Sequence, residues 1–299
     1  MRIARSLQRV APSRSEKNLN FRLFKKIMAN RRTRISMEVA FTVCLAIFAG
    51  LLYVGMQKGH KLANRQFKLT DNNISHIYDL HQTYPTVWFV LAWFVIAGII
   101  FGMDYLRSRT FKYPFITAWT FIQLIVITLL FTTIGKVMFA RLRPDFIDRC
   151  FGLKNVAIGD VPEPLLVGGW YSTRQCNNPF SSFVLDGRVS FPSGHSSLAA
   201  LFATVLSVYV FYYWRHIITF SGLFIFVSTV WCWAIWVIAS RTFNYRHHPG
   251  DVIAGALIGL IIGGVFPYLC ELNRAKIFAS DFIVTPDKKV EVDEIAIEQ

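Results

Sequence analysis

The segment from Ser240 to Asp251 gathers two arginines, two histidines and a carboxylate between two stretches that are almost purely apolar. Pro249 suits the first turn of a helix, where its missing N–H costs nothing, so His247 would lie at a helix start. Asp251 follows four residues later and can accept a hydrogen bond from one ring nitrogen, which leaves the lone pair of the other free to attack. A helix N-terminus also favours an anion. The pattern indicates phosphate chemistry, although a polar helix cap at a membrane interface would explain it as well.

Two cations come directly after another apolar stretch. Lys136 and Arg143 lie seven residues apart, and Pro144 follows. We expect the helix to continue as far as Pro144, which would place both cations on one helical face, two turns apart. An ammonium and a planar guanidinium suit the non-bridging oxygens of a phosphoryl group. The alternative is a pair of snorkelling cations at the end of a membrane span.

A third motif, Pro192-Ser193-Gly194-His195, directly precedes an apolar stretch. Ser193 can cap a helix, and Gly194 lets backbone N–H groups approach an anion without a side chain in the way. His195 would then lie at the rim of that anion site. A helix cap with an incidental histidine is the alternative.

The elements that must position these motifs are membrane helices. The 299-residue chain is 54% hydrophobic and 15% aromatic, more apolar than is usual for a soluble protein. Within lipid only a helix satisfies its own backbone polar groups in a single segment. The sequence therefore predicts an all-α fold, a bundle of six transmembrane helices with the active site formed by two loops on one face. The six apolar stretches run over about 37–56, 86–103, 115–135, 196–214, 217–239 and 252–270. Small residues at Gly255, Gly259 and Gly263 predict close helix packing inside the bundle rather than at a dimer seam.

Charge is concentrated at the N-terminus. Residues 1–35 contain eleven Lys/Arg and one acid, and so hold ten of the net fourteen positive charges. A basic segment before a first span is typical of the cytosolic side and of contact with anionic lipid, and no nucleic-acid motif is present, so we expect no nucleic-acid partner. An organelle transit peptide is the alternative for this segment.

The positive-inside rule predicts cytosolic termini and an active site on the luminal or extracytoplasmic side. The loops 136–192 and 240–251 share one face by parity, although the first of them is also basic. The expected domains are a basic N-terminal segment (1–35), a six-span domain (36–270) and a flexible cytosolic tail (271–299). The host membrane stays open between vacuole, endoplasmic reticulum, Golgi and plasma membrane.

Two of the five cysteines, Cys150 and Cys176, lie in the loop that we place in the lumen. An oxidising compartment would allow them to pair. The disulfide would close a loop of about 27 residues and stabilise the fold by roughly 3 kcal/mol.

Taken together, the three motifs resemble the signature motifs of the type 2 phosphatidic acid phosphatase superfamily at every signature position. They are Lys136-x6-Arg143-Pro144, Pro192-Ser193-Gly194-His195 and Ser240-Arg241-x5-His247-x3-Asp251. Longer stretches, such as Arg143 to Cys150 and Tyr245 to His248, are similar to fungal lipid phosphate phosphatases that act on phosphatidate and diacylglycerol pyrophosphate. The resemblance covers about residues 60 to 275.

The resemblance implies a role for each motif residue. His247 would be the nucleophile that forms a phosphohistidine, with Asp251 orienting it, and His195 would protonate the leaving oxygen and later activate water. The phosphate-binding groups would be Lys136, Arg143, Ser193, Gly194 and Arg241. No metal and no cofactor is expected, because the only motif carboxylate is Asp251. The implied substrates are phosphatidate, diacylglycerol pyrophosphate and lysophosphatidate.

Two other functions remain open. A membrane phosphotransferase would use the same phosphohistidine but pass the phosphoryl group to a lipid alcohol. A non-catalytic protein that binds or moves lipids is the second alternative, and the complete set of motif residues weighs against it.

Overall fold

The computed structural model describes residues 36, 39–56, 62, 64–79, 83, 86–152, 169–177, 179 and 181–278, and the side chains of 86, 88–90 and 274–278 are outside this description. The chain divides into two compact units. One is Thr42–Asn273, which holds all the motifs. The other combines Met1–Phe41 with Arg274–Gln299. The basic segment 1–35 and most of the expected tail, 271–299, lie outside the described residues.

The described chain is mostly helical, and six of its helical segments are long and apolar enough to cross a membrane. They are Val39–Met56, Leu91–Ser108, Lys112–Phe139, Gly194–Trp214, Phe220–Phe243 and Pro249–Asn273. The second to fifth of these segments belong to α2 (Thr86–Ser108), α3 (Lys112–Phe139), α6 (Gly194–Trp214) and α7 (Phe220–Phe243). The sixth segment is made of two consecutive helices, α8 (Pro249–Gly264) and α9 (Phe266–Phe278). The predicted all-α, six-span fold is confirmed. Several limits differ: α2, α3, α7 and α9 continue past the expected ends at residues 103, 135, 239 and 270.

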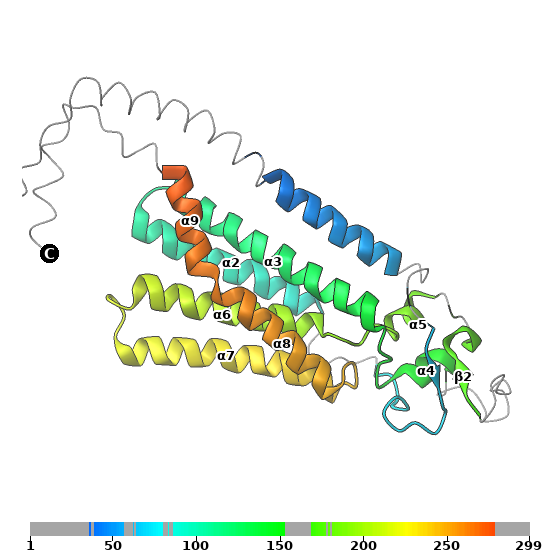
Figure 1. Cartoon of the computed structure of the whole chain (residues 1–299). Helices are drawn as coiled ribbons and strands as arrows, with labels where there is room; N and C mark the ends of the chain where they lie inside the picture. The colour runs from blue at the N-terminus through cyan, green and yellow to red at the C-terminus, as the bar shows by residue number, and fades with distance from the viewer. Residues whose placement is uncertain are drawn as a thin grey trace, which may run out of the picture. The chain divides into compact units, whose positions relative to one another are not determined.

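Helix α6 is the centre of the bundle. Of its span 78% is buried inside the protein, against 11–39% for the other five, and it packs against α2, α3, α7 and α8 (Figure 1). Apolar side chains of the surrounding helices face outward, among them Phe94, Phe220 and Ile261, which are 73%, 83% and 72% exposed. An outward apolar surface of this extent fits contact with lipid.

Helix α8 lies against α6 along its glycines. A Cβ atom at Gly255 would stand 2.4 Å from the Ser193 carbonyl oxygen, and one at Gly259 would stand 2.1 Å from that of Ser197. Real side chains do not tolerate such distances, so the glycines permit the backbone contact. The predicted packing of this small-residue face inside the bundle is confirmed, and it brings the start of α8 to the start of α6.

A small loop domain lies beyond the helix ends at the motif side (Figure 1). It contains the short antiparallel pair β1 (Gln66–Phe67) and β2 (Tyr171–Ser172), the helices α4 (Phe146–Phe151) and α5 (Ser182–Asp186), and the 3-10 turn η2 (Thr173–Gln175). Aromatic rings of Phe67, Phe146, Phe151 and Tyr171 form its core. Cys150 and Cys176, the pair expected from the sequence, are joined by a disulfide in this domain.

The end of α3 corrects one prediction. The helix does not continue to Pro144 but ends at Phe139, and Ala140 takes a left-handed conformation (φ 41°, ψ 42°). The next residues leave the helix and pair with another loop: the Arg143 N–H donates to the Gly187 oxygen at 2.8 Å, and the Ser190 N–H donates to the Arg141 oxygen at 2.9 Å. Lys136 and Arg143 therefore do not share a helical face.

Candidate active site

His247 and Asp251 stand where the sequence places them, at the start of α8. His248 is the N-cap residue, Pro249 is the first helical residue, and the His248 N–H donates to Asp251 Oδ2 at 2.9 Å. The backbone N–H groups of Arg246 and His247 both donate to the Arg241 oxygen, at 3.0 and 3.2 Å. The loop thus folds back over the end of α7 and fixes His247 relative to Arg241.

The loop domain holds this turn from outside. Tyr245 has a positive φ of 51°, and its ring stacks on His76 with ring centroids 3.9 Å apart. The Arg246 guanidinium lies 3.9 Å from the centre of the Tyr78 ring and donates to the backbone carbonyl oxygen of Asp79 at 2.6 Å. A non-glycine residue in this conformation costs energy, and these contacts offset that cost.

The orientation of His247 is set by Ser190. Nδ1 lies 2.7 Å from the Ser190 carbonyl oxygen, and because a carbonyl oxygen can only accept, Nδ1 carries the hydrogen. The lone pair of the imidazole is therefore on Nε2. Asp251 Oδ2 is 3.9 Å from Nδ1, too far for a hydrogen bond, and accepts instead from the Ser190 hydroxyl at 2.5 Å. The sequence suggested a direct bond from Asp251 to the histidine, whereas the structure inserts Ser190 between them.

Burial and, after it, neighbouring positive charge set the protonation of His247. Burial, and then the neighbouring Arg143, Lys136 and His195, lower the pKa of His247 well below its usual value, while the Ser190 carbonyl opposes the shift. The side chain is 3% exposed. A neutral imidazole is the form in which Nε2 can act as a nucleophile.

Lys136 and Arg143 reach the site from different backbone conformations. Lys136 lies in the last turn of α3, and its Nζ donates to the Val189 oxygen at 2.8 Å. Arg143 Nη2 pairs with Asp186 Oδ1 at 2.7 Å. Burial alone would raise the pKa of Asp186, but Arg143, Arg149 and Lys136 lower it to about 2. Asp186 is thus an anchor for the arginine that sequence motifs did not reveal.

The Pro192–His195 motif is joined to the other two through the backbone. Ser193 caps α6, its Oγ accepting from the Ser196 N–H at 3.4 Å, as expected. The Ser193 N–H donates to the backbone carbonyl oxygen of Asp251 at 3.0 Å, and a Cβ at Gly135 would stand 2.6 Å from the Pro192 ring. Helices α3, α6 and α8 therefore converge on this point.

The structure brings the predicted site residues together. His195, in the first turn of α6, lies within electrostatic range of Arg241, Arg143 and Lys136, and the last two act on His247 as well. Arg241 is 2% exposed in the last turn of α7 and donates from Nε and Nη2 to the Ser240 hydroxyl at 3.1 and 3.0 Å. Three cations and two histidines around one buried point can bind and transfer a phosphoryl group.

Among the residues with described positions, no three His, Cys, Asp or Glu side chains are grouped as a metal ion would require.

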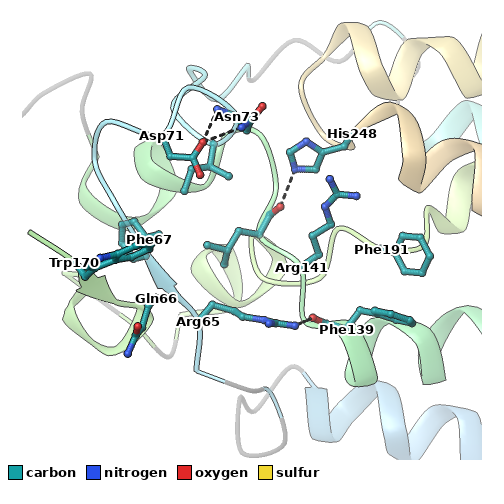
Figure 2. A pocket seen from close by; sticks show the side chains of 12 residues that line it. Arg65, Gln66, Phe67, Asp71, Asn73, Phe139, Arg141, Trp170, Phe191 and His248 are labelled. Atoms are coloured by element: carbon teal, nitrogen blue, oxygen red, sulfur yellow. Dashed lines mark hydrogen bonds between the residues drawn. The ribbon is translucent and has the colours of Figure 1, made fainter. Parts of the chain in front are cut away.

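A cavity of about 740 Å³ opens beside this cluster (Figure 2). Its lining residues are Arg65, Gln66, Phe67, Asp71, Asn73, Ile74, Phe139, Arg141, Leu142, Trp170, Phe191 and His248. None of the predicted phosphate-binding or catalytic residues is in this lining. The cavity touches the site through Arg141, whose Nη1 donates to Asp251 Oδ1 at 2.8 Å, and through His248, whose Nε2 lies 3.0 Å from the Leu142 oxygen.

The model of the PAP2 superfamily matches residues 117–274 of the chain. The protein belongs to the PAP2 superfamily. It is similar to the probable diacylglycerol pyrophosphate phosphatase 1 of Schizosaccharomyces pombe, with 30% identity over 217 residues that cover 67% of this chain and 70% of the relative. Diacylglycerol pyrophosphate phosphatase 1 of Saccharomyces cerevisiae is 28% identical over 218 residues, 68% of this chain and 69% of the relative.

Lipid phosphate phosphatase 1 of Saccharomyces cerevisiae is 33% identical over 131 residues, which cover 42% of each chain. No solved structure gives a significant match. Superfamily membership, phosphatase relatives and six spanning helices identify this protein as a multi-pass membrane phosphatase.

Proposed function

We propose that this enzyme removes phosphate from lipid phosphates through a phosphohistidine at His247. Phosphatidate, diacylglycerol pyrophosphate and lysophosphatidate are the proposed substrates, since two similar proteins are named for diacylglycerol pyrophosphate and one for lipid phosphates. The observation that carries the mechanism is the hydrogen bond between His247 Nδ1 and the Ser190 carbonyl, which leaves the Nε2 lone pair available for attack.

In the first step His247 Nε2 attacks the phosphorus atom, and the bond from phosphorus to the lipid oxygen breaks. His195 gives its proton to that leaving oxygen. Lys136, Arg143 and Arg241, with backbone N–H groups at Ser193 and Gly194, stabilise the three equatorial oxygens of the transferring group.

In the second step His195 takes a proton from water, whose oxygen attacks phosphorus while the bond to Nε2 breaks. Inorganic phosphate leaves, and His247 returns to the neutral form. Asp251 lies 3.9 Å from Nδ1 and favours the positive charge that the ring carries while it is phosphorylated. The guanidinium and ammonium groups supply the positive charge that a metal ion supplies in other phosphatases, so we propose that no metal and no cofactor is needed.

We propose that the site faces the lumen or the outside and that both termini are cytosolic. The basic segment before the first span supports this orientation under the positive-inside rule. The disulfide between Cys150 and Cys176 supports it too, because the bond lies on the motif side of the bundle and such bonds persist in oxidising compartments.

The test is phosphate release from a panel of lipid phosphates in detergent micelles, with excess chelator present. The wild type should stay active, and His247→Ala should lose at least about 10³-fold in kcat because it lacks the nucleophile. Equal thermal unfolding of the two proteins controls for folding. Activity retained in His247→Ala, or a strict requirement for added magnesium, would contradict the proposal.

The same assay separates the alternatives when a lipid alcohol is added. A phosphorylated alcohol in place of free phosphate would identify a phosphotransferase. Lipid binding without release or transfer of phosphate would identify a non-catalytic lipid-binding protein.

A further inference from the structure

Arg141 connects the cavity to the buried carboxylate behind His247. Its side chain is 45% exposed and lines the cavity, and its Nη1 donates to Asp251 Oδ1 at 2.8 Å (Figure 2). The end of α3 at Phe139 makes this possible, because the backbone of Arg141 then pairs with that of Ser190, the second partner of the same carboxylate.

Asp251 is completely buried, and both of its oxygens are engaged. Oδ1 accepts from Arg141, and Oδ2 accepts from the Ser190 hydroxyl and the His248 N–H. Within the described part of the chain, Arg141 is the one arginine or lysine that forms an ion pair with it. A buried carboxylate is strongly destabilised when its charged partner is removed, so its position depends on Arg141.

We propose that Arg141 is a positioning residue of the phosphatase reaction. It holds Asp251, Asp251 holds the Ser190 hydroxyl, and the carbonyl of that same serine sets the ring of His247. The inference rests on the function proposed above and extends it to Arg141, one of the six unspecified positions between Lys136 and Arg143 in the first motif. The side of attack supports the assignment: Arg141 and the cavity lie behind Nδ1, whereas phosphate must approach Nε2.

A purely structural ion pair is the competing explanation, and kinetics distinguish the two. Since Arg141 lies behind Nδ1, Arg141→Ala should lower kcat about 10- to 100-fold, the scale of a small misplacement of a reacting group, and leave KM nearly unchanged. Arg141→Lys should retain part of the rate, because an ammonium can still donate to Oδ1 but lacks the planar fork.

The cavity permits a sharper test by chemical rescue. In Arg141→Ala the vacated position adjoins a cavity of about 740 Å³, large enough to admit guanidinium ion. Guanidinium chloride, kept well below concentrations that unfold the protein, should restore part of kcat in this variant and not raise it in the wild type. Sodium chloride at the same ionic strength should restore nothing.

Arg65→Ala is the matched control. Arg65 lines the same cavity, but its guanidinium donates to the Phe139 oxygen and makes no contact with Asp251. Its loss should leave kcat within about twofold, since surface substitutions away from buried networks have small effects.

A double-mutant cycle with Ser190→Ala gives a second test. Ser190→Ala and Arg141→Ala act through one carboxylate, so the fold-loss of kcat in the double variant should be smaller than the product of the fold-losses in the two single variants.

The outcomes are distinct. The inference fails if Arg141→Ala keeps its kcat, if only KM changes, if guanidinium ion restores nothing in a protein with wild-type thermal unfolding, or if Arg65→Ala loses as much activity. If Arg141→Ala does not fold, kcat of folded Arg141→Lys decides: an intermediate loss supports the inference and an unchanged value overturns it. A wild type without phosphatase activity would overturn the proposed function itself, and this inference with it.

Discussion

Burial and three neighbouring groups keep His247 neutral, and this sets how its reactivity depends on pH. A histidine is a nucleophile above its pKa, so a lowered pKa extends the active range toward acid. Lys136 is among the cations that lower the pKa of His247. Removing that charge should therefore raise the pKa of the histidine.

We expect the acid limb of kcat/KM to move to higher pH in Lys136→Gln than in the wild type. The two proteins should be compared on one lipid phosphate, because the ionisation of the substrate then contributes equally to both profiles. The rate will also fall at every pH, since the lysine is a proposed phosphate-binding group. An acid limb that stays in place or moves to lower pH would show that Lys136 does not control the charge of His247.

Some residues of the candidate site could be predicted from the sequence, and others became evident only in the structure. The grouping of motif residues such as His195 and His247 was predictable, because side chains capable of phosphoryl chemistry occur there at characteristic spacings. Ser190 was not predictable, since it acts through a backbone carbonyl that every residue possesses. The placement of Arg143 was wrong because the left-handed turn at Ala140 depends on pairing with a loop more than forty positions further along the chain.

At the scale of elements, the contact between α6 and α8 sets the distance between the Ser193 motif and the His247 motif. Gly259 is its tightest point: a Cβ there would lie 2.1 Å from the Ser197 oxygen and 2.6 Å from the Leu201 nitrogen. Both are backbone atoms of a buried helix, so a clash can be relieved only by separating the two helices.

Gly259→Ala should therefore destabilise the protein by about 1–3 kcal/mol, the usual cost of overpacking, and lower kcat as well. Gly98→Ala in α2 is the matched control, because a Cβ at Gly98 would meet no heavy atom within 4 Å. That change should be neutral or stabilise by up to about 1 kcal/mol through helix propensity. Thermal unfolding and phosphate release measure both effects, and equal stability of the two variants would contradict the packing argument.

The membrane spans could be predicted from the sequence because each needs a long apolar run. The ends of the helices were predicted less well where tertiary contacts determine how far a helix continues. Helix α2 includes Asp104, a charge that the expected limit at 103 left outside the span. The carboxylate is buried there because it accepts from the Thr117 hydroxyl at 2.5 Å and the Tyr209 hydroxyl at 3.2 Å. The two-residue strands of the loop domain carry no periodic pattern that a sequence could reveal.

At the scale of the whole molecule, the proposed orientation puts the reaction on the opposite side of the membrane from both termini. In sealed vesicles whose cytosolic face is on the inside, protease should remove terminal epitope tags only after detergent is added, and a membrane-impermeant lipid phosphate analogue added outside should be hydrolysed without detergent. Tags that are cleaved in intact vesicles would reverse the topology. Parity keeps the loops 136–192 and 240–251 on one face in either case.

Trapping the phosphoenzyme tests the central claim most directly. In His195→Ala a lipid pyrophosphate should still phosphorylate the enzyme, because its leaving group is a phosphate with a second pKa of about 6 and needs little protonation. Hydrolysis of the intermediate should be slow, because no base activates water. Rapid quenching with terminally labelled substrate should therefore yield an acid-labile, alkali-stable label that peptide mapping places on His247, and His247→Ala should show none. A label on another residue, or a phosphoenzyme that still forms in His247→Ala, would contradict the assignment of His247 as the nucleophile.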